Sequence, residues 1–328
     1  MIEKHHKVSI LIPAYNVEKY IFRAIESSLN QTYPYIEIVI VDDGSTDSTW
    51  DIIEKYAANN PSIKPYKQSN SGVSNARNNA MQRCSGDYII FLDSDDWLEA
   101  DAVRQLMHRV SDDRYLICCD RFFAYLDDND TISRFPQCKK QDDEIIEIED
   151  ALCSEGTGEY NIQSACYKLF SIDVIKRNNL KFSSSISHGE DGLFVFEYLQ
   201  FCKGIIFVYE PLWNILERPG SATTAPYNSK WLTMIDAIDS MIAIAKKYCG
   251  VAENIKNYKV KVLKILMSAF LKNKEVSEND FYIIRGHMRH CIKEYNKADF
   301  KLWIFAYLPR NVLYFLYGFY IKIRSINY

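Results

Sequence analysis

The sequence predicts an α/β protein with a mostly parallel central sheet and a helical region after it. Apolar runs of strand length at residues 8–12, 36–41 and 86–92 alternate with segments whose apolar residues recur at helical spacing. Such alternation is typical of a parallel sheet wound with crossover helices. With 328 residues, the chain is long enough for one large α/β domain and an appendage.

The elements can be placed in order along the chain. The first strand precedes Pro13, which we expect to end it because proline cannot continue a central strand. Ser45 or Asp47 could cap the helix after the second strand. The expected strands are 8–12, 36–41, 65–68 and 86–92, and the expected helices are 18–29, 49–58 and a segment ending near residue 84.

Three carboxylates follow the strand at 86–92 within four residues, in the run Asp93, Ser94, Asp95 and Asp96. An open α/β sheet binds its ligands at this end of its strands. Neighbouring carboxylates repel one another, and their hard oxygens suit Mg²⁺ or Mn²⁺, which usually also takes ligands from substrate phosphates. The alternative is an acidic loop that caps the next helix.

A second polar strand end lies in the same predicted sheet. Asp42 and Asp43 close the strand at 36–41, and Arg77 lies between the two acidic strand ends in sequence. Acidic groups with one basic residue suit a nucleotide diphosphate that carries a divalent ion. The chain has neither G-x-G-x-x-G nor G-x-x-x-x-G-K-[ST], which weighs against a dinucleotide dehydrogenase and a P-loop NTPase.

Composition and charge narrow the class further. Nine cysteines, an odd number without C-x-x-C spacing, are typical of reduced thiols in a cytosolic protein. The amino-terminal apolar run is too short for a signal peptide or a spanning helix. Residues 251–328 hold 14 basic and 6 acidic residues, whereas residues 1–250 hold 25 and 37. This asymmetry suggests an anionic partner for the tail, and the acidic body argues against nucleic acid.

Four segments carry a family resemblance. VSILIPAYN, EIVIVDDGSTD, NSGVSNARNNA and GDYIIFLDSDDWL together resemble the amino-terminal half of a family 2 glycosyltransferase with the GT-A fold, over residues 7 to about 105. The resemblance implies inverting transfer from a nucleotide-diphosphosugar donor, with Asp95 and Asp93 at a Mg²⁺ or Mn²⁺ ion. Loop packing is the alternative for Tyr15, and helix capping for Asp42. The implied donor-binding residues here are Pro13, Ala14, Tyr15, Asp42, Asp43, Arg77, Asp93 and Ser94.

The later segments add candidates for catalysis. An acceptor hydroxyl needs a positioned base, and Asp191, beside Glu190 at the start of a helical run, is the candidate. This pair resembles the catalytic acidic pair of the family, whereas helix capping is the alternative. Lys168, after Tyr167 where the family often has tryptophan, is a further donor candidate or a solvated lysine. The resemblance adds Arg218 and Ser221 to the donor site, and Trp213 and His188 are acceptor candidates with structural packing as the alternative.

Three regions are expected: a glycosyltransferase domain at 1–225, a helical appendage at 226–298 and an amphipathic tail at 299–328. The tail combines aromatic residues with four cations, which suits a helix lying on an anionic membrane surface. The alternatives are docking on the protein or a homodimer interface. His287 and His290 share a helix face but lack further metal ligands nearby.

These observations favour a cytoplasmic enzyme, peripheral at the inner face of the cell membrane. The expected reaction moves a sugar from a UDP-hexose or UDP-N-acetylhexosamine to a glycan or lipid-linked acceptor. Capsule, lipopolysaccharide or other surface polysaccharide synthesis is the setting that the resemblance implies. The alternative is a non-catalytic module that binds nucleotide sugars.

Overall fold

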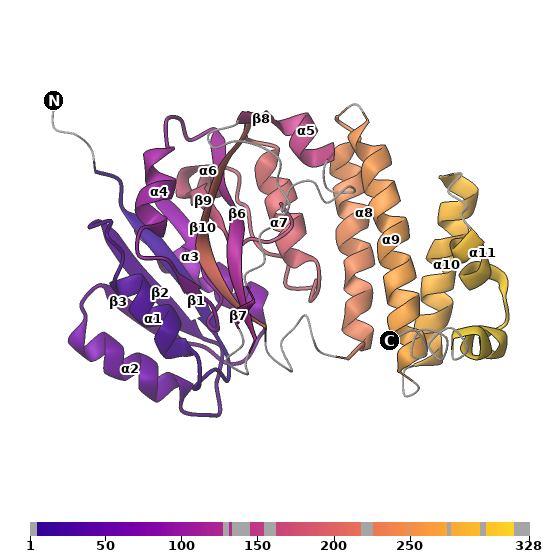
Figure 1. Cartoon of the computed structure of the whole chain (residues 1–328), viewed down its shortest axis with the longest axis horizontal. Helices are drawn as coiled ribbons and strands as arrows, with labels where there is room; N and C mark the ends of the chain where they lie inside the picture. The colour runs from indigo at the N-terminus through magenta and orange to yellow at the C-terminus, as the bar shows by residue number, and fades with distance from the viewer. Residues whose placement is uncertain are drawn as a thin grey trace. The chain divides into compact units, whose positions relative to one another are not determined.

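The computed structural model describes residues 5–126, 131–132, 145–153, 162–217, 226–248, 250–273, 277–295 and 300–317. The chain forms two compact units (Figure 1). The first contains residues up to 185 together with 190–221, and it holds the sheet. The second contains residues 186–189 and the chain from 222 onward, and it is helical.

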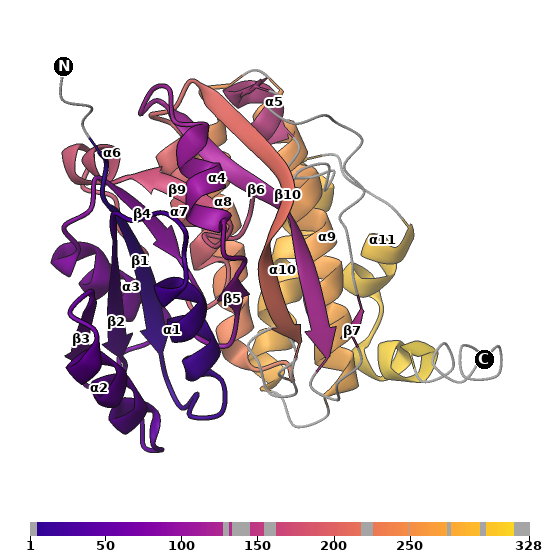
Figure 2. The ribbon, with the colours of Figure 1, turned by 60° about the vertical axis from the view of Figure 1, so that its left-hand side comes forward.

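The sheet of the first unit is mixed. Its strands run in the order β3-β2-β1-β4-β9-β6-β10-β5, with β7 beside β6 and β8 beside β10. Pairing is parallel from β3 to β4, which lie side by side in Figure 2, and between β6 and β10, while β9 is antiparallel to both its neighbours. The strands are β1 (Val8–Ala14), β2 (Ile36–Asp42), β3 (Ile63–Lys67), β4 (Tyr88–Phe91), β5 (Trp97–Leu98), β6 (Tyr115–Leu126), β7 (Thr131–Ile132), β8 (Ile145–Glu147), β9 (Lys168–Ser171) and β10 (Gly204–Glu217).

Helices connect and cover these strands. In this unit α3 packs on β1 and β2, α1 packs on β5 and β1, and α4 packs on β10 and β6. The apolar face of α1, formed by Ile21, Ala24 and Ile25, is buried, as its helical spacing predicts. The helices are α1 (Ile21–Leu29), α2 (Thr49–Asn59), α3 (Val73–Arg83), α4 (Ala102–His108), α5 (Ile148–Cys153), α6 (Ile172–Arg177) and α7 (Glu190–Leu199).

Pro13 does not end the first strand, so that expectation is wrong. It lies inside β1, in register with Val41 of β2. The pairing of β1 with β4 stops at Leu11. From there β1 has a strand neighbour on one side only, and proline is tolerated where a strand edge is unpaired.

A buried carboxylate fastens the starts of β1, β2 and β4 together. Glu37 of β2 accepts hydrogen bonds from the Ser9 hydroxyl (2.6 Å), the Lys7 ammonium (2.8 Å) and the Ser85 hydroxyl (2.7 Å). Ser9 in turn accepts from the Gly86 amide. A Cβ at Gly86 would lie 2.5 Å from the Ser9 oxygen, so only glycine fits this approach. The network sets where β4 enters the sheet.

Four of the helices in the described part of the second unit pack in sequence order after a short 3₁₀ turn, η2 (Ser229–Leu232). They are α8 (Thr233–Ala245), α9 (Val251–Lys272), α10 (Glu278–Glu294) and α11 (Phe300–Tyr307). Arg285 and Arg289 of α10 both donate to the Ala306 carbonyl near the end of α11, which satisfies a helix-terminal acceptor. Within the described ranges, no helix is long and apolar enough to span a bilayer.

Candidate active site

In the acidic turn after β4, one carboxylate is buried in a structural contact and two are partly exposed. Asp96 is only 4% exposed, and it accepts a hydrogen bond from the Leu216 amide of β10 (3.0 Å). The Asp96 amide donates to the Asp93 carbonyl, which closes the turn. Asp96 therefore holds the turn against β10, and Asp93 and Asp95 remain as its partly exposed carboxylates.

Arg77 joins three carboxylates that are far apart in sequence. It lies on α3 and is 4% exposed. One terminal nitrogen donates to Asp93 (3.1 Å), and the other donates to Asp191 and lies 3.4 Å from Glu190. The end of β4 and the start of α7 thus meet at a single guanidinium group. We expected Arg77 to approach a donor diphosphate, but here its guanidinium binds protein carboxylates.

Aromatic packing fixes the place of this guanidinium. Its central carbon lies 5.2 Å from the centroid of the Phe182 ring, a cation–π distance. Phe182 is held to α3 because its amide and carbonyl both bond the Asn78 side chain. The same ring stacks on Phe194 of α7, with centroids 4.1 Å apart. Phe182 therefore positions α3 against α7, and no sequence motif marked it.

A buried lysine holds the loop that bonds Asp191. The Ala165 amide donates to Asp191 (3.3 Å). The Lys168 ammonium donates to the carbonyl of Ser164 (2.6 Å), the residue before Ala165. Lys168 is fully buried, so it acts on the site through this loop.

Burial raises the basicity of the pair. Desolvation and the neighbouring Asp191 charge raise the pKa of Glu190 to about 7, although Arg77 opposes the change. Desolvation also raises the pKa of Asp191, again against the Arg77 charge. Such a pair can hold one proton near neutral pH, so that one carboxylate can accept a proton from a bound hydroxyl.

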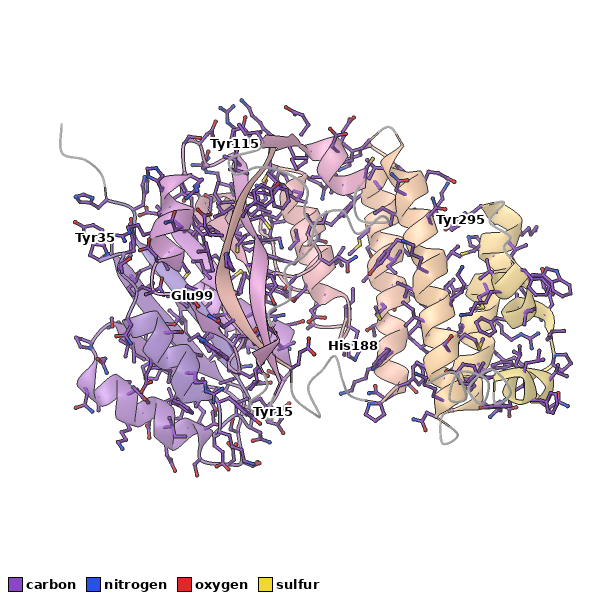
Figure 3. All side chains as sticks on the ribbon, in the orientation of Figure 1. Tyr15, Tyr35, Glu99, Tyr115, His188 and Tyr295 are labelled. Carbon is purple, nitrogen blue, oxygen red and sulfur yellow. The ribbon has the colours of Figure 1, made fainter. Side chains whose placement is uncertain are left out.

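The ends of β1 and β2 form a second part of the site. Asp43 is 4% exposed and accepts hydrogen bonds from the Gln68 side chain and from the amides of Ser71 and Gly72. It therefore shapes the loop before α3. Tyr15, labelled in Figure 3, follows β1 and is 47% exposed, so its ring is available to a ligand.

Three residues expected to contact ligands are buried in this structure, because Asp42, Lys168 and Trp213 are each 0% exposed. Asp42 is the last residue of β2, pairs with Ala14 in the sheet and accepts from the Ser45 amide. Trp213 lies within β10 between neighbouring strands and packs edge-on against Tyr167. These side chains are parts of the scaffold in this structure.

The other expected residues lie as follows. Pro13, Ala14 and Ser94 are buried at the strand ends. His188 belongs to the second unit, where its ring lies 5.5 Å from that of Trp231. Arg218 and Ser221 lie outside the described residues.

The acidic turn fits a divalent ion that substrate completes. Across the described part of the chain, no three His, Cys, Asp or Glu side chains are grouped to hold a metal on their own. Mg²⁺ is commonly held by one or two carboxylates plus substrate phosphates. Asp95 and Asp93 offer such a partial, all-oxygen set.

Two relatives show where the sequence is shared. The chain is 28% identical over 246 residues to "Glycosyltransferase GlyA" of Streptococcus pneumoniae, a match covering 73% of this chain and 34% of that protein. It is 49% identical over 111 residues to a chondroitin synthase of Escherichia coli, which covers 34% of this chain and 16% of that protein. The chain thus spans only a minor part of these longer relatives.

The fold and the family agree. The structure resembles Staphylococcus aureus TarS 1-349, solved in complex with UDP-GlcNAc, with a TM-score of 0.65 and 20% identity over 88% of this chain and 82% of that one. The fold is GT-A, an α/β sheet with C-terminal helices. The model for "Glycosyl transferase family 2" matches residues 9–184, more than half of the chain. The protein therefore belongs to glycosyl transferase family 2.

Proposed function

We propose that this protein is an inverting glycosyltransferase that uses a nucleotide-diphosphate sugar. The observation that carries this proposal is the meeting of Asp93, Glu190 and Asp191 at Arg77. A strand-end carboxylate and a half-buried carboxylate pair of raised pKa lie at one place, and perturbed titrating groups of this kind cluster at functional sites. Family membership supports sugar transfer as the reaction that they would serve.

Asp191 is the base in this proposal. It takes the proton of an acceptor hydroxyl as that oxygen forms a bond to the anomeric carbon, and the bond from this carbon to the diphosphate breaks. Attack opposite the leaving group inverts the anomeric centre. Arg77 and the Ala165 amide hold Asp191 in place while it accepts the proton.

The donor would lie along the strand ends. Tyr15 and Asp43, with the backbone at Pro13 and Ala14, would contact the base and ribose. Asp93 would also contact the ribose, and Ser94 would bind the donor beside it. Arg218 and Ser221 would close over the diphosphate. Asp95, with Asp93, would hold Mg²⁺ or Mn²⁺, which offsets the charge of the departing diphosphate.

The donor is proposed to be a UDP-hexose or UDP-N-acetylhexosamine. A solved protein of the same fold binds UDP-GlcNAc, and a matching relative is a chondroitin synthase. We propose a glycan or lipid-linked acceptor and a role in surface polysaccharide synthesis.

A membrane surface is the proposed second partner, bound at the inner face of the cell membrane. Large apolar side chains remain exposed on α11 and after it, including Phe300 (80%), Trp303 (47%) and Phe315 (73%). The opposite side of α11 buries Leu302, Phe305 and Ala306. Aromatic residues of this kind suit the interface of a bilayer.

Donor binding can be tested by thermal unfolding with a panel of UDP-sugars, each with and without Mn²⁺. A ligand that binds the folded state raises its melting temperature. We expect at least one sugar nucleotide to stabilise the wild type when Mn²⁺ is present, and Asp95→Asn to lose the metal-dependent part. Stabilisation that is equal without metal, or equal in Asp95→Asn, would contradict the metal site.

A nucleotide-sugar-binding module without turnover is the competing proposal. It would give the same thermal shift but release no UDP with any acceptor or with water. UDP release by the wild type would exclude it.

A further inference from the structure

The helical unit contains a pocket of its own. Its volume is about 590 Å³, within the roughly 300–1,000 Å³ of small-molecule sites. Side chains and backbone from α8, α9 and α10 line it. Besides Ile283 and Gly286, the lining consists of the polar and aromatic residues Asp239, Lys259, Tyr282, His287 and His290.

Lys259 is a buried cation at this pocket, with 1% exposure. Its ammonium has three N–H donors, and within the described residues it pairs with the carboxylate of Asp239 alone. A buried ammonium with unused donors is costly unless another acceptor completes it. The missing acceptors are those that a ligand in the pocket would supply.

Gly286 is a second sign of a binding site. It lies inside α10, where glycine costs about 1 kcal/mol relative to alanine. A Cβ at this position would meet no atom within 4 Å. Packing therefore does not require glycine here. Because glycine has no side chain, the space beside this position in the pocket stays free for a ligand.

The lining selects the ligand by its hydrogen bonds. A hydroxyl group can donate to Asp239 and accept from Lys259 at once, whereas a phosphate would meet the Asp239 carboxylate with like charge. Burial and the Lys259 charge lower the pKa of His287, so this imidazole is neutral at pH 7 and offers one donor and one acceptor. Tyr282, 60% exposed, provides a flat apolar ring.

We propose that this pocket binds a pyranose glycan through its hydroxyl groups. Sugars combine dense hydroxyls with apolar C–H faces, and the lining offers a partner for each. The site consists entirely of second-unit residues and is formed without the carboxylates at Arg77. Identifying the bound glycan as the chain that the enzyme extends rests on the proposed function.

The test is saturation-transfer NMR on the full chain without donor, using chitotetraose, cellotetraose, maltotetraose and lacto-N-tetraose at millimolar concentration. We expect saturation to pass from the protein to at least one tetrasaccharide, which would show that it binds. Gly286→Met, which fills the open space with a good helix former, and His290→Ala should each weaken binding about tenfold, the equivalent of one lost hydrogen bond or contact. Lys293→Ala on the same helix, outside the lining, is the matched control and should bind as the wild type does.

If none of the four sugars receives saturation from the protein, or if Gly286→Met binds as the wild type does, the proposal is overturned. Inorganic phosphate is run in parallel, and phosphate binding without sugar binding would replace the glycan by an anion. Because no donor is present, failure here leaves UDP release as an independent test of the proposed function.

Discussion

At the scale of single residues, Arg77 connects the carboxylates of the proposed site. It is buried, stacked on Phe182 and bonded to carboxylates from two distant segments. Its charge opposes the burial that raises the pKa of Asp191. Arg77 is therefore a positioning residue that both orients the proposed base and keeps it ionised at a lower pH.

Replacing Arg77 should move the pH dependence of the reaction. In Arg77→Met the pKa of Asp191 loses its main lowering influence, so the acidic limb of kcat/KM should shift to higher pH. Arg77→Lys should show a smaller shift than Arg77→Met, because it keeps the charge but loses the forked geometry. A merely structural role would instead scale kcat/KM down equally at every pH, and that result would refute the positioning role.

Glu190 should also link stability to pH. Its pKa is raised from 4.5 to about 7 by folding, so between these values the folded state binds more protons than the unfolded state. The group's stabilisation is complete below pH 4.5 and is lost as pH rises through 7. The melting temperature of Glu190→Gln should therefore exceed that of the wild type by more at pH 8 than at pH 5.

The exposed Glu54→Gln provides the comparison, with little expected change at either pH. If Glu190→Gln shows the same difference from wild type at both pH values, the raised pKa of Glu190 is excluded.

At the scale of elements, parallel strands bring the strand-end residues to one edge. β1, β2 and β4 are adjacent, so Tyr15, Asp43 and Asp93 follow neighbouring strands although 78 residues separate the first from the last. The Glu37 network aligns the other ends of these strands. Sheet register at one end therefore supports the geometry of the site at the other.

Removing the Glu37 charge should loosen this arrangement. Although burial opposes ionisation, hydrogen bonds from Lys7, Ser9 and Ser85 lower the pKa of Glu37 to about 2. We expect Glu37→Gln to cost about 2 kcal/mol in the free energy of unfolding at pH 7, as measured with urea.

The sign of the pH dependence follows from the lowered pKa. The stabilisation by Glu37 is present above pH 4.5 and is lost as pH falls toward 2. The difference between wild type and Glu37→Gln should therefore shrink from pH 7 to pH 3. A constant difference would show that shape, not charge, is what Glu37 contributes.

The strands, helices and acidic turn could be predicted from sequence because they depend on local patterns. Apolar runs mark buried strands, and an abrupt change to carboxylates marks their ends. The residues whose positions differ from the sequence-based expectation depend on tertiary contacts instead. Pro13 lies in a strand because β4 ends early, and Lys168 is buried because it bonds the loop at Ser164. Phe182 belongs to no motif, and only the fold brings its ring under Arg77.

At the scale of the whole molecule, a sheet-based unit carries the family motifs, and two surfaces in the described part of the helical unit are proposed to bind partners. One is the pocket at Lys259, and the other is the exposed apolar set Phe300, Trp303 and Phe315. The family motifs account for neither surface.

The apolar set can be tested by flotation with vesicles that contain anionic lipid. The triple variant Phe300→Ser, Trp303→Ser and Phe315→Ser should lose most of its flotation, because it removes the aromatic residues that would enter the interface. Ile265→Ser, which changes another exposed apolar residue on α9, should float as the wild type does. Equal flotation of the triple variant and the wild type would disprove the membrane contact.

The most direct test of the central claim is the rate of UDP release from the stabilising UDP-sugar, with Mn²⁺ and added glycan acceptors, by wild type and Asp191→Asn. Loss of a general base typically costs about 10²–10⁴-fold in rate, so we expect a decrease of that size in the variant, with donor binding retained. Equal rates of UDP release would contradict the assignment of Asp191, and with it the catalytic centre at Arg77.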